Sequence, residues 1–220
     1  MVQKKSDDEV ILKPEENRWT SQSSTDMCIK LQKLNLLNKQ LFNSCMYTDC
    51  AIKENTFPRS VSNGSVFSDI MLVDAFPTEY SAYTGCLTDE RGYILEEALI
   101  ETQHTRDSIY CTDMIKCHNV QDLNHDCVVN CLKHYFFKEL EIVNPKAIIL
   151  TDSAYKACVK YEILPADNYN YFTWNNTSIL PFKKPVSVAV IWDFKSVLDS
   201  PDQRSVQAFI SGLKTLLKLL

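Results

Sequence analysis

The chain alternates short, continuous apolar runs with longer segments in which apolar residues recur every three or four positions. Runs of the first kind predict buried strands, at residues 69–73, 108–112, 147–150 and 186–191. Segments of the second kind predict helices, at residues 25–42, 92–102, 126–143, 153–161 and 203–220. Strands that alternate with helices indicate an α/β fold, in which a mostly parallel central sheet is covered on both faces as three αβα layers.

The start of the chain differs from this pattern. It is rich in Ser, Asp, Glu and Lys without sustained periodicity, which predicts a flexible arm over residues 1–26 and a single domain over residues 27–220. No apolar run approaches the roughly 18 residues that a membrane span requires, and the N-terminus lacks the apolar core of a secretory signal. We therefore expect a cytoplasmic protein that does not bind a membrane.

Composition narrows the possible chemistry. A formal net charge of -5 argues against a strongly basic surface that coats nucleic acid, although it allows a local basic patch. The nine cysteines are an odd number in a chain of 220 residues, which disfavours a disulfide scaffold and favours metal ligation. The chain has only four glycines and no P-loop or dinucleotide-binding glycine motif, so a nucleotide-cradling loop is not expected.

Two pairs of cysteines are candidate metal ligands. Four residues separate Cys45 from Cys50, and thirteen separate Cys117 from Cys131. Four thiolates in a tetrahedral arrangement suit either an iron–sulfur cluster or zinc, and the spacing does not choose between them. Cys131 lies on an apolar helical segment and would also fit there as a small core residue.

The segments around these cysteines resemble a known family. They are an apolar strand that enters a proline-containing loop (residues 70–77), Ile109-Tyr-Cys-Thr-Asp-Met-Ile-Lys-Cys117, Cys131-Leu-Lys-His-Tyr-Phe-Phe-Lys-Glu-Leu140 and Pro145-Lys-Ala-Ile-Ile-Leu150. In this order, over about residues 45–160, the chain resembles the family-4 uracil-DNA glycosylases. The resemblance implies a uracil-DNA glycosylase-like fold with a 4Fe-4S cluster, or less favourably zinc, on Cys45, Cys50, Cys117 and Cys131. The first pair is spaced more widely than the two intervening residues usual in the family.

The resemblance also implies a substrate. Such enzymes flip a uracil out of DNA, stack it on an aromatic ring, read its polar edge and break its bond to the sugar. The expected partner is therefore DNA, single-stranded or with a flipped base, and the expected process is base excision in DNA repair.

The loop after the first strand departs from the family pattern. It reads Asp74-Ala75-Phe76-Pro77-Thr78 where the family has Gly-Glu-Ala-Pro-Gly, so Ala75 replaces the acidic residue that positions water. Asp74 could supply a catalytic carboxylate instead, or it could cap a turn, as Asp commonly does. Phe76 and Pro77 are the candidates for contact with the base. Residues 84–88, where the stacking ring is expected, contain no aromatic residue, so Phe76 or Tyr83 could substitute for it, or either ring could serve only in packing.

Two further positions differ from the family. Asp113 stands where the family has a base-reading asparagine, and an ionised carboxylate only accepts hydrogen bonds, so it suits an exocyclic amino group better than uracil. Asp193 and Lys195 occupy the place of a catalytic histidine, and Lys195 could stabilise negative charge on the leaving base. None of the four histidines is expected to replace it. Alternatively, Asp74, Asp113 and Asp193 could converge on a divalent cation.

These departures leave the function open. The first hypothesis is a DNA glycosylase of altered specificity or mechanism. The second is a non-catalytic protein, DNA-binding or replication-associated, that retains the fold and uses the cluster as a structural element. A small-molecule hydrolase or metal-binding module that uses the three carboxylates is a third hypothesis.

Overall fold

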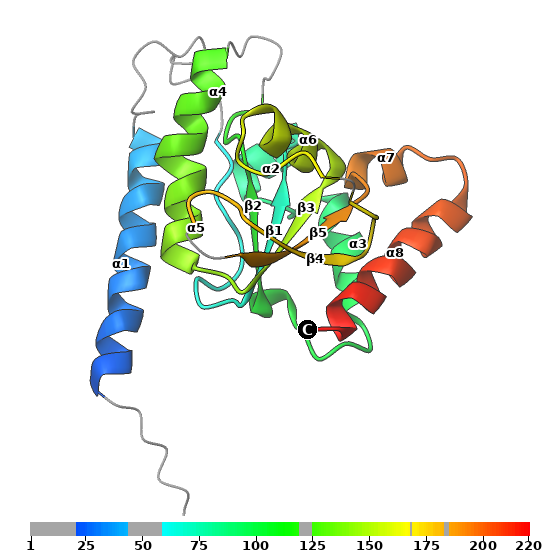
Figure 1. Ribbon diagram of the computed structural model, residues 1–220, viewed down its shortest axis with the longest axis horizontal. Coiled ribbons are helices and arrows are strands. Elements are labelled where there is room, and N and C mark those ends of the chain that lie inside the picture. Colours follow the sequence, from blue (N-terminus) through cyan, green and yellow to red (C-terminus); the bar gives the residue numbers. More distant parts are fainter. Residues whose placement is uncertain (1–20, 44–58, 119–124, 168, 183–184) are drawn as a thin grey trace, which may run out of the picture.

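A five-stranded sheet forms the centre of the computed structural model, which describes residues 21–43, 59–118, 125–167, 169–182 and 185–220 (Figure 1). The parallel strands are β1 (Ile70–Asp74), β2 (Ile109–Asp113), β3 (Ala147–Thr151) and β5 (Val186–Ile191), in the order β2-β1-β3-β5. The antiparallel strand β4 (Trp174–Thr177) extends the sheet beyond β5. Each parallel strand lies within one residue of the apolar run that predicted it, and the expected fold class is confirmed.

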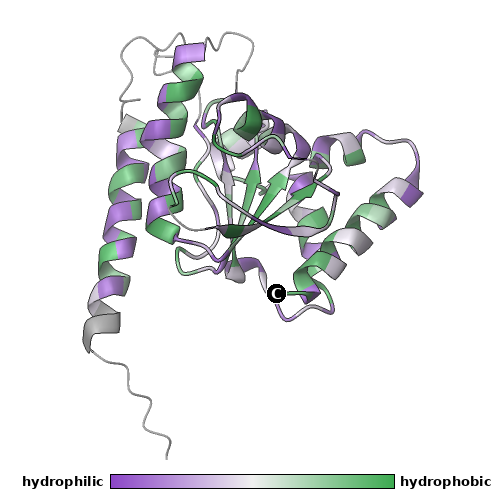
Figure 2. Ribbon diagram, viewed as in Figure 1, coloured by the Kyte–Doolittle hydropathy of each residue, from purple (hydrophilic) through white to green (hydrophobic). Residues whose placement is uncertain are grey.

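Alternate residues of the strands belong to two separate cores, one on each face of the sheet. Figure 2 shows that much of the central sheet is coloured as hydrophobic. One core joins Met71, Val73 and Ile148 to the helices α4 (His125–Cys131), η2 (Leu132–Phe136), α5 (Phe137–Val143) and α6 (Asp152–Lys160). The other joins Ile70 and Leu72 to α3 (Glu90–Leu99), α7 (Phe194–Leu198) and α8 (Gln203–Lys218). Successive side chains of a strand point to opposite faces, so a sheet covered on both faces requires the continuous apolar runs seen in the sequence.

Helix α1 (Ser21–Asn43) lies outside the α4–α5 layer (Figure 1). Leu37 and Leu41 pack with Tyr135, and Lys30 Nζ donates a hydrogen bond of 2.8 Å to the carbonyl oxygen of Val143, at the end of α5. The helix begins at Ser21, which lies within the predicted N-terminal arm. Helix α1 is thus an additional helix that packs through apolar side chains on the outside of the α4–α5 layer of the three-layer fold.

The helix predicted over residues 126–143 is present but irregular. Its middle section, η2, is a π-helical turn that begins directly after Cys131. A π-helical turn inserts one residue into a helix without breaking it, and such turns are frequent at functional sites. The position of this turn is therefore consistent with a functional role for the adjacent Cys131.

Four short elements were not predicted from the sequence: α2 (Glu79–Thr84), the 3-10 helix η1 (Arg106–Ser108), α7 and the edge strand β4. Their residues lack a clear apolar period, because α2, η1 and α7 are too short to show one and β4 has the largely polar sequence Trp174-Asn-Asn-Thr177. Among the described residues, no helix combines the length and apolarity needed to cross a membrane.

Gly64 imposes a constraint that can be tested. Its φ is 102°, and a Cβ added there would lie 2.1 Å from the carbonyl oxygen of Ile109 on β2. We expect Gly64→Ala to lower the free energy of unfolding by about 2–3 kcal/mol, because this backbone conformation is strained for alanine and β2 would have to shift. The matched control is Gly85→Ala, with φ 109° but a nearest contact of 3.4 Å, which should cost only about 1 kcal/mol. Equal losses in urea denaturation would contradict the role of the contact with β2.

Candidate functional site

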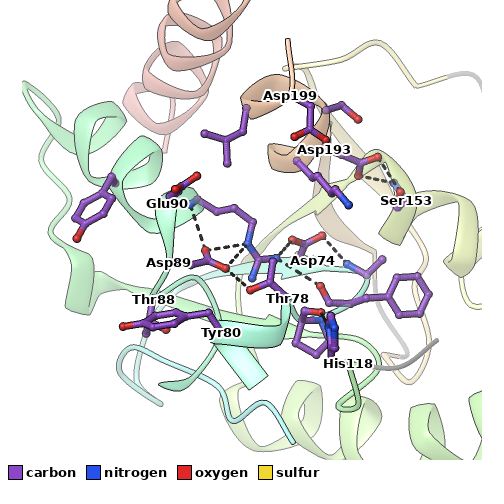
Figure 3. A pocket seen from close by; sticks show the side chains of 18 residues that line it. Asp74, Thr78, Tyr80, Thr88, Asp89, Glu90, His118, Ser153, Asp193 and Asp199 are labelled. Carbon is purple, nitrogen blue, oxygen red and sulfur yellow. Dashed lines mark hydrogen bonds and ion pairs between the residues drawn. The ribbon is translucent and has the colours of Figure 1, made fainter. Parts of the chain in front are cut away.

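A cavity of about 1020 Å³ opens at the carboxyl ends of β1 and β5 (Figure 3). Its walls are the loop after β1, the start of α3 and the segment from Asp193 to Asp199. Ligands of parallel α/β sheets bind at this edge, where loops from several strands meet. The cavity therefore stands where the sequence predicted a site, and of the predicted residues it is lined by Asp74, Phe76, Pro77, Asp193 and Lys195.

Asp74 is the last residue of β1, and both of its carboxylate oxygens are bound. Oδ1 accepts hydrogen bonds from the backbone N–H of Ala75 (2.8 Å) and from Thr151 Oγ1 (3.0 Å). Oδ2 accepts one from Arg91 Nη1 (2.6 Å). Burial raises the pKa of Asp74 above its usual value, and the charge of Arg91 opposes that rise. The structure thus holds this carboxyl group in one orientation at the cavity wall.

Arg91, near the start of α3, is a site residue that the sequence did not reveal. Its guanidinium is buried and donates to Asp89 Oδ1 (2.9 Å), to Asp74 and to Ser81 Oγ (2.8 Å). Burial opposes the positive charge, but the hydrogen bond with Asp89 and the charge of Asp74 outweigh it and raise the pKa of Arg91. Arg91 is therefore charged at all ordinary pH values and neutralises part of the negative charge of Asp74 and Asp89.

Asp113, the predicted base reader, occupies the end of β2 directly beside Asp74 in the sheet register. It is fully buried and does not belong to the cavity wall. Ser60 Oγ donates to Oδ2, whereas Oδ1 has no hydrogen-bond partner among the described residues. Burial and the charge of Asp74 raise the pKa of Asp113 to about 7, although Ser60 and Arg91 oppose the shift. Near neutral pH both forms of this carboxyl group are therefore populated, and the protonated form can donate a hydrogen bond as well as accept one.

Asp193 and Lys195 lie at the opposite wall, after β5. Asp193 accepts hydrogen bonds from the backbone N–H of Ser153 (2.9 Å) and from Ser153 Oγ (2.7 Å), as Figure 3 shows. These bonds fix the start of α7, which carries Lys195, against the start of α6. Lys195 makes no ion pair within the described part of the chain, so its ammonium group is available to a ligand.

The hypothesis of a three-aspartate cation site is wrong. Asp74 is bound by Arg91, Asp113 by Ser60 and Asp193 by Ser153. Among the described residues, which include all three aspartates, no group of three or more carboxylate, histidine or cysteine side chains could hold a metal ion.

Three residues missed by the sequence reasoning also line the cavity: His118, Tyr80 and Tyr93. His118 Nδ1 lies 3.1 Å from the carbonyl oxygen of Pro77 and, because a carbonyl only accepts, it is the donor. In the neutral ring Nε2 is then left as an acceptor. His118 therefore lies at the cavity, whereas the prediction that no histidine takes the place of the family's catalytic histidine stays a prediction. Tyr80 and Tyr93 are 59% and 71% exposed, at the rim.

Comparison with protein families shows to which superfamily this domain belongs. Residues 61–211 match the model of the Uracil DNA glycosylase superfamily. The chain belongs to this superfamily. Among curated proteins, none matches the chain closely enough to count as a relative. The match covers β1 to most of α8, so the cavity lies wholly within the superfamily domain.

The cysteine ligand set extends beyond the superfamily match. Cys45 and Cys50 lie outside the described residues, so their prediction as ligands stays untested. Cys117 is buried after β2, and its backbone forms an antiparallel bridge with that of Arg59. Cys131 ends α4 and packs on the cluster of Leu37, Leu41 and Tyr135. Cys131 therefore packs beside the end of α1, and Cys117 is linked to that end through Arg59, whose Nη1 donates to the carbonyl oxygen of Leu41.

Proposed function

We propose that the protein binds DNA at this cavity and excises a base from it, as a DNA glycosylase with an altered set of catalytic residues. Membership of the Uracil DNA glycosylase superfamily supports this class of activity. The observation that carries the proposal is Asp74, a carboxyl group on the cavity wall whose two oxygens are held by Ala75, Thr151 and Arg91. A charged group stabilises a transition state best when it is already oriented before the reaction, and these hydrogen bonds orient the carboxylate of Asp74.

The reaction assigns a role to each wall of the cavity. When the bond between the sugar and the base breaks, the base leaves with the electron pair and the sugar carbon becomes positive. Water then adds its oxygen to that carbon and releases a proton. The negative charge of Asp74 stabilises the sugar cation, and the ammonium group of Lys195, positioned by the Asp193–Ser153 bonds, stabilises the departing base. Phe76 and Pro77 provide the apolar contact with the base.

The polar groups at the cavity favour a base that offers a donor to the protein. Nε2 of neutral His118 accepts a hydrogen bond, as it would from the ring N–H of uracil or from the amino group of cytosine. Asp113, behind the wall, is close enough to Asp74 and Arg91 for their charges to shift its own pKa.

The rim of the cavity suits unpaired DNA. Tyr80 and Tyr93 line the cavity with most of their surface exposed, and Tyr83, one turn after Tyr80 on α2, is 71% exposed. Exposed aromatic rings stack on unpaired bases without a requirement for sequence. We infer that the substrate is single-stranded DNA or a duplex with a flipped base.

We further propose that Cys45, Cys50, Cys117 and Cys131 hold a 4Fe-4S cluster, with zinc as the alternative occupant. Four cysteine thiolates are the donor set that both require. Two observations support this proposal: Cys131 packs on the cluster of Leu37, Leu41 and Tyr135, and Cys117 is bridged to Arg59, which binds the carbonyl oxygen of Leu41. Leu41 lies near the end of α1, and the segment directly after α1 contains the other two cysteines. When bound, the centre would cross-link these elements and stabilise the domain.

The test is excision from oligonucleotides that contain uracil or modified cytosines, single-stranded and duplex, with abasic sites detected by alkaline cleavage. Asp74→Asn should lower the excision rate about 100-fold, because the amide keeps the shape but loses the charge. Asp69→Asn is the matched control: this aspartate directly precedes the same strand, and its exposed side chain pairs with Lys146 at the surface. Its rate should equal that of the wild type. Equal rates for the two variants would contradict the role of Asp74.

A second candidate is the non-catalytic DNA-binding protein. One observation favours it: Arg91 binds Asp74 directly, so much of the negative charge is neutralised, and the neighbouring residue is Ala75 rather than an acid. This candidate predicts that folded, metal-loaded protein binds single-stranded DNA and forms no abasic sites on any of these substrates. Excision that depends on Asp74 would exclude it.

A further inference from the structure

Arg59 is a buried cation with too few partners. The residue is only 6% exposed, and its Nη1 donates a hydrogen bond of 2.8 Å to the carbonyl oxygen of Leu41. Within the described ranges, Nε and Nη2 are buried without a hydrogen-bond partner. In the part of the chain that the structure describes, Arg59 makes no ion pair. A buried charge without an opposite charge is strongly destabilising, so these N–H groups indicate an anion that the described chain does not supply.

The surroundings of Arg59 show where that anion would lie. The backbone of Arg59 bridges to that of Cys117, and the next residue, Ser60, donates its N–H to the carbonyl oxygen of Lys116 (2.8 Å). At its other end, the guanidinium binds Leu41, in the same cluster on which Cys131 packs. Arg59 thus connects the backbone at Cys117 to the cluster on which Cys131 packs.

We propose that Arg59 donates Nε–H and Nη2–H to an anionic metal–thiolate centre held at Cys117 and Cys131. This inference rests on the cofactor proposed above. A centre with four thiolate ligands carries net negative charge, which a guanidinium offsets, whereas a buried water would satisfy the N–H groups without balancing the charge. Charge and hydrogen bonds at the sulfurs set the reduction potential of iron–sulfur clusters. A positive neighbour favours the reduced, more negative state and raises the potential.

The experiment uses the full chain, purified or reconstituted without oxygen, as wild type, Arg59→Gln, Arg59→Lys and Arg106→Gln. Arg106 is the matched control, since its Nη1 contacts Cys111 Sγ (3.1 Å), a thiol outside the proposed ligand set. Folding is checked by circular dichroism, and loss of metal to a chelator is timed. Arg59→Gln should lose metal about tenfold faster than the wild type and, if the centre is iron–sulfur, have a more negative reduction potential. Arg59→Lys should lie between them, and Arg106→Gln should match the wild type.

A measurement on the wild type covers the case in which Arg59→Gln does not fold. Labelling with ¹⁵N-arginine should produce nitrogen couplings in the pulsed EPR spectrum of the reduced cluster, or, for zinc, protection of one guanidinium from hydrogen exchange that is lost on metal removal. Folded Arg59→Gln with an unchanged rate of metal loss, or wild type without these signals, would overturn the role of Arg59 alone. Wild type that contains neither iron, sulfide nor zinc would overturn the cofactor as well, whereas the excision assay is read independently.

Discussion

Replacing Glu139 with alanine is expected to lower the free energy of unfolding by about 3–5 kcal/mol. Glu139 Oε2 lies 2.7 Å from Lys116 Nζ and 2.6 Å from Thr112 Oγ1, and Lys116 Nζ is also 2.6 Å from Thr112 Oγ1. The charged side chains of this group are 1% and 2% exposed. Removal of the carboxylate leaves the ammonium group of Lys116 buried without an opposite charge, which is the most costly way to break such a pair.

Two controls make the cause of this loss clear. The Lys146–Asp69 pair has side chains that are 78% and 64% exposed, so Lys146→Ala should change the free energy of unfolding by less than about 1 kcal/mol. The double variant Lys116→Met with Glu139→Leu should recover most of the loss, because no charge stays buried. Urea denaturation followed by circular dichroism measures all of them. A loss below about 1 kcal/mol for Glu139→Ala would show that water reaches Lys116.

Asp113→Asn is expected to remove a large part of the pH dependence of stability. Because burial raises the pKa of Asp113 from 3.8 to about 7, the folded protein holds a proton that the unfolded chain releases between these values. The stabilising contribution of Asp113 is therefore complete below about pH 4 and is lost as the pH rises through about 7. By pH 8 the wild type should have lost on the order of 4 kcal/mol of stability from this group, whereas the Asp113→Asn variant should have lost none from this position.

The measurement is urea denaturation of both proteins between pH 4.5 and pH 8. The gap between the two curves should widen with pH in favour of the variant, since an amide needs no proton to stay neutral. Asp69→Asn, which changes an exposed side chain, should run parallel to the wild type. Parallel curves for Asp113→Asn and the wild type would mean that Asp113 is ionised in the folded protein.

The sequence predicted the sheet well because each parallel strand is covered on both faces. A strand such as β3 must then be apolar at every position, and the run Ala147-Ile-Ile-Leu150 is visible without knowledge of its neighbours. Strand β4 lies at the edge, is largely polar and owes its conformation to pairing with β5, which no local pattern reports.

The candidate site was predicted only where it depends on strand ends. Asp74 and Asp193 follow apolar runs, so the rule that loops at the carboxyl edge carry function placed both on the cavity. Arg91 and His118 reach it from segments with no such signal, and a charged residue next to a helix start usually indicates only solvent exposure. Asp113 follows a strand too, but its side chain is covered, because Ser60 lies against it from a segment far away in the sequence.

The π-helical turn η2 sets the direction in which the side chains of α5 point relative to those of α4. Each residue of a regular α-helix advances the direction of the side chain by about 100°, so removing one residue from η2 would rotate α5 by that angle relative to α4. Leu140 and Val143 could then face the sheet only if Cys131 turned away from the end of α1. The inserted residue thus allows α5 to pack its apolar side chains on the sheet while α4 directs the thiol of Cys131 toward α1. The number of residues in this helix is therefore as tightly constrained as their identity.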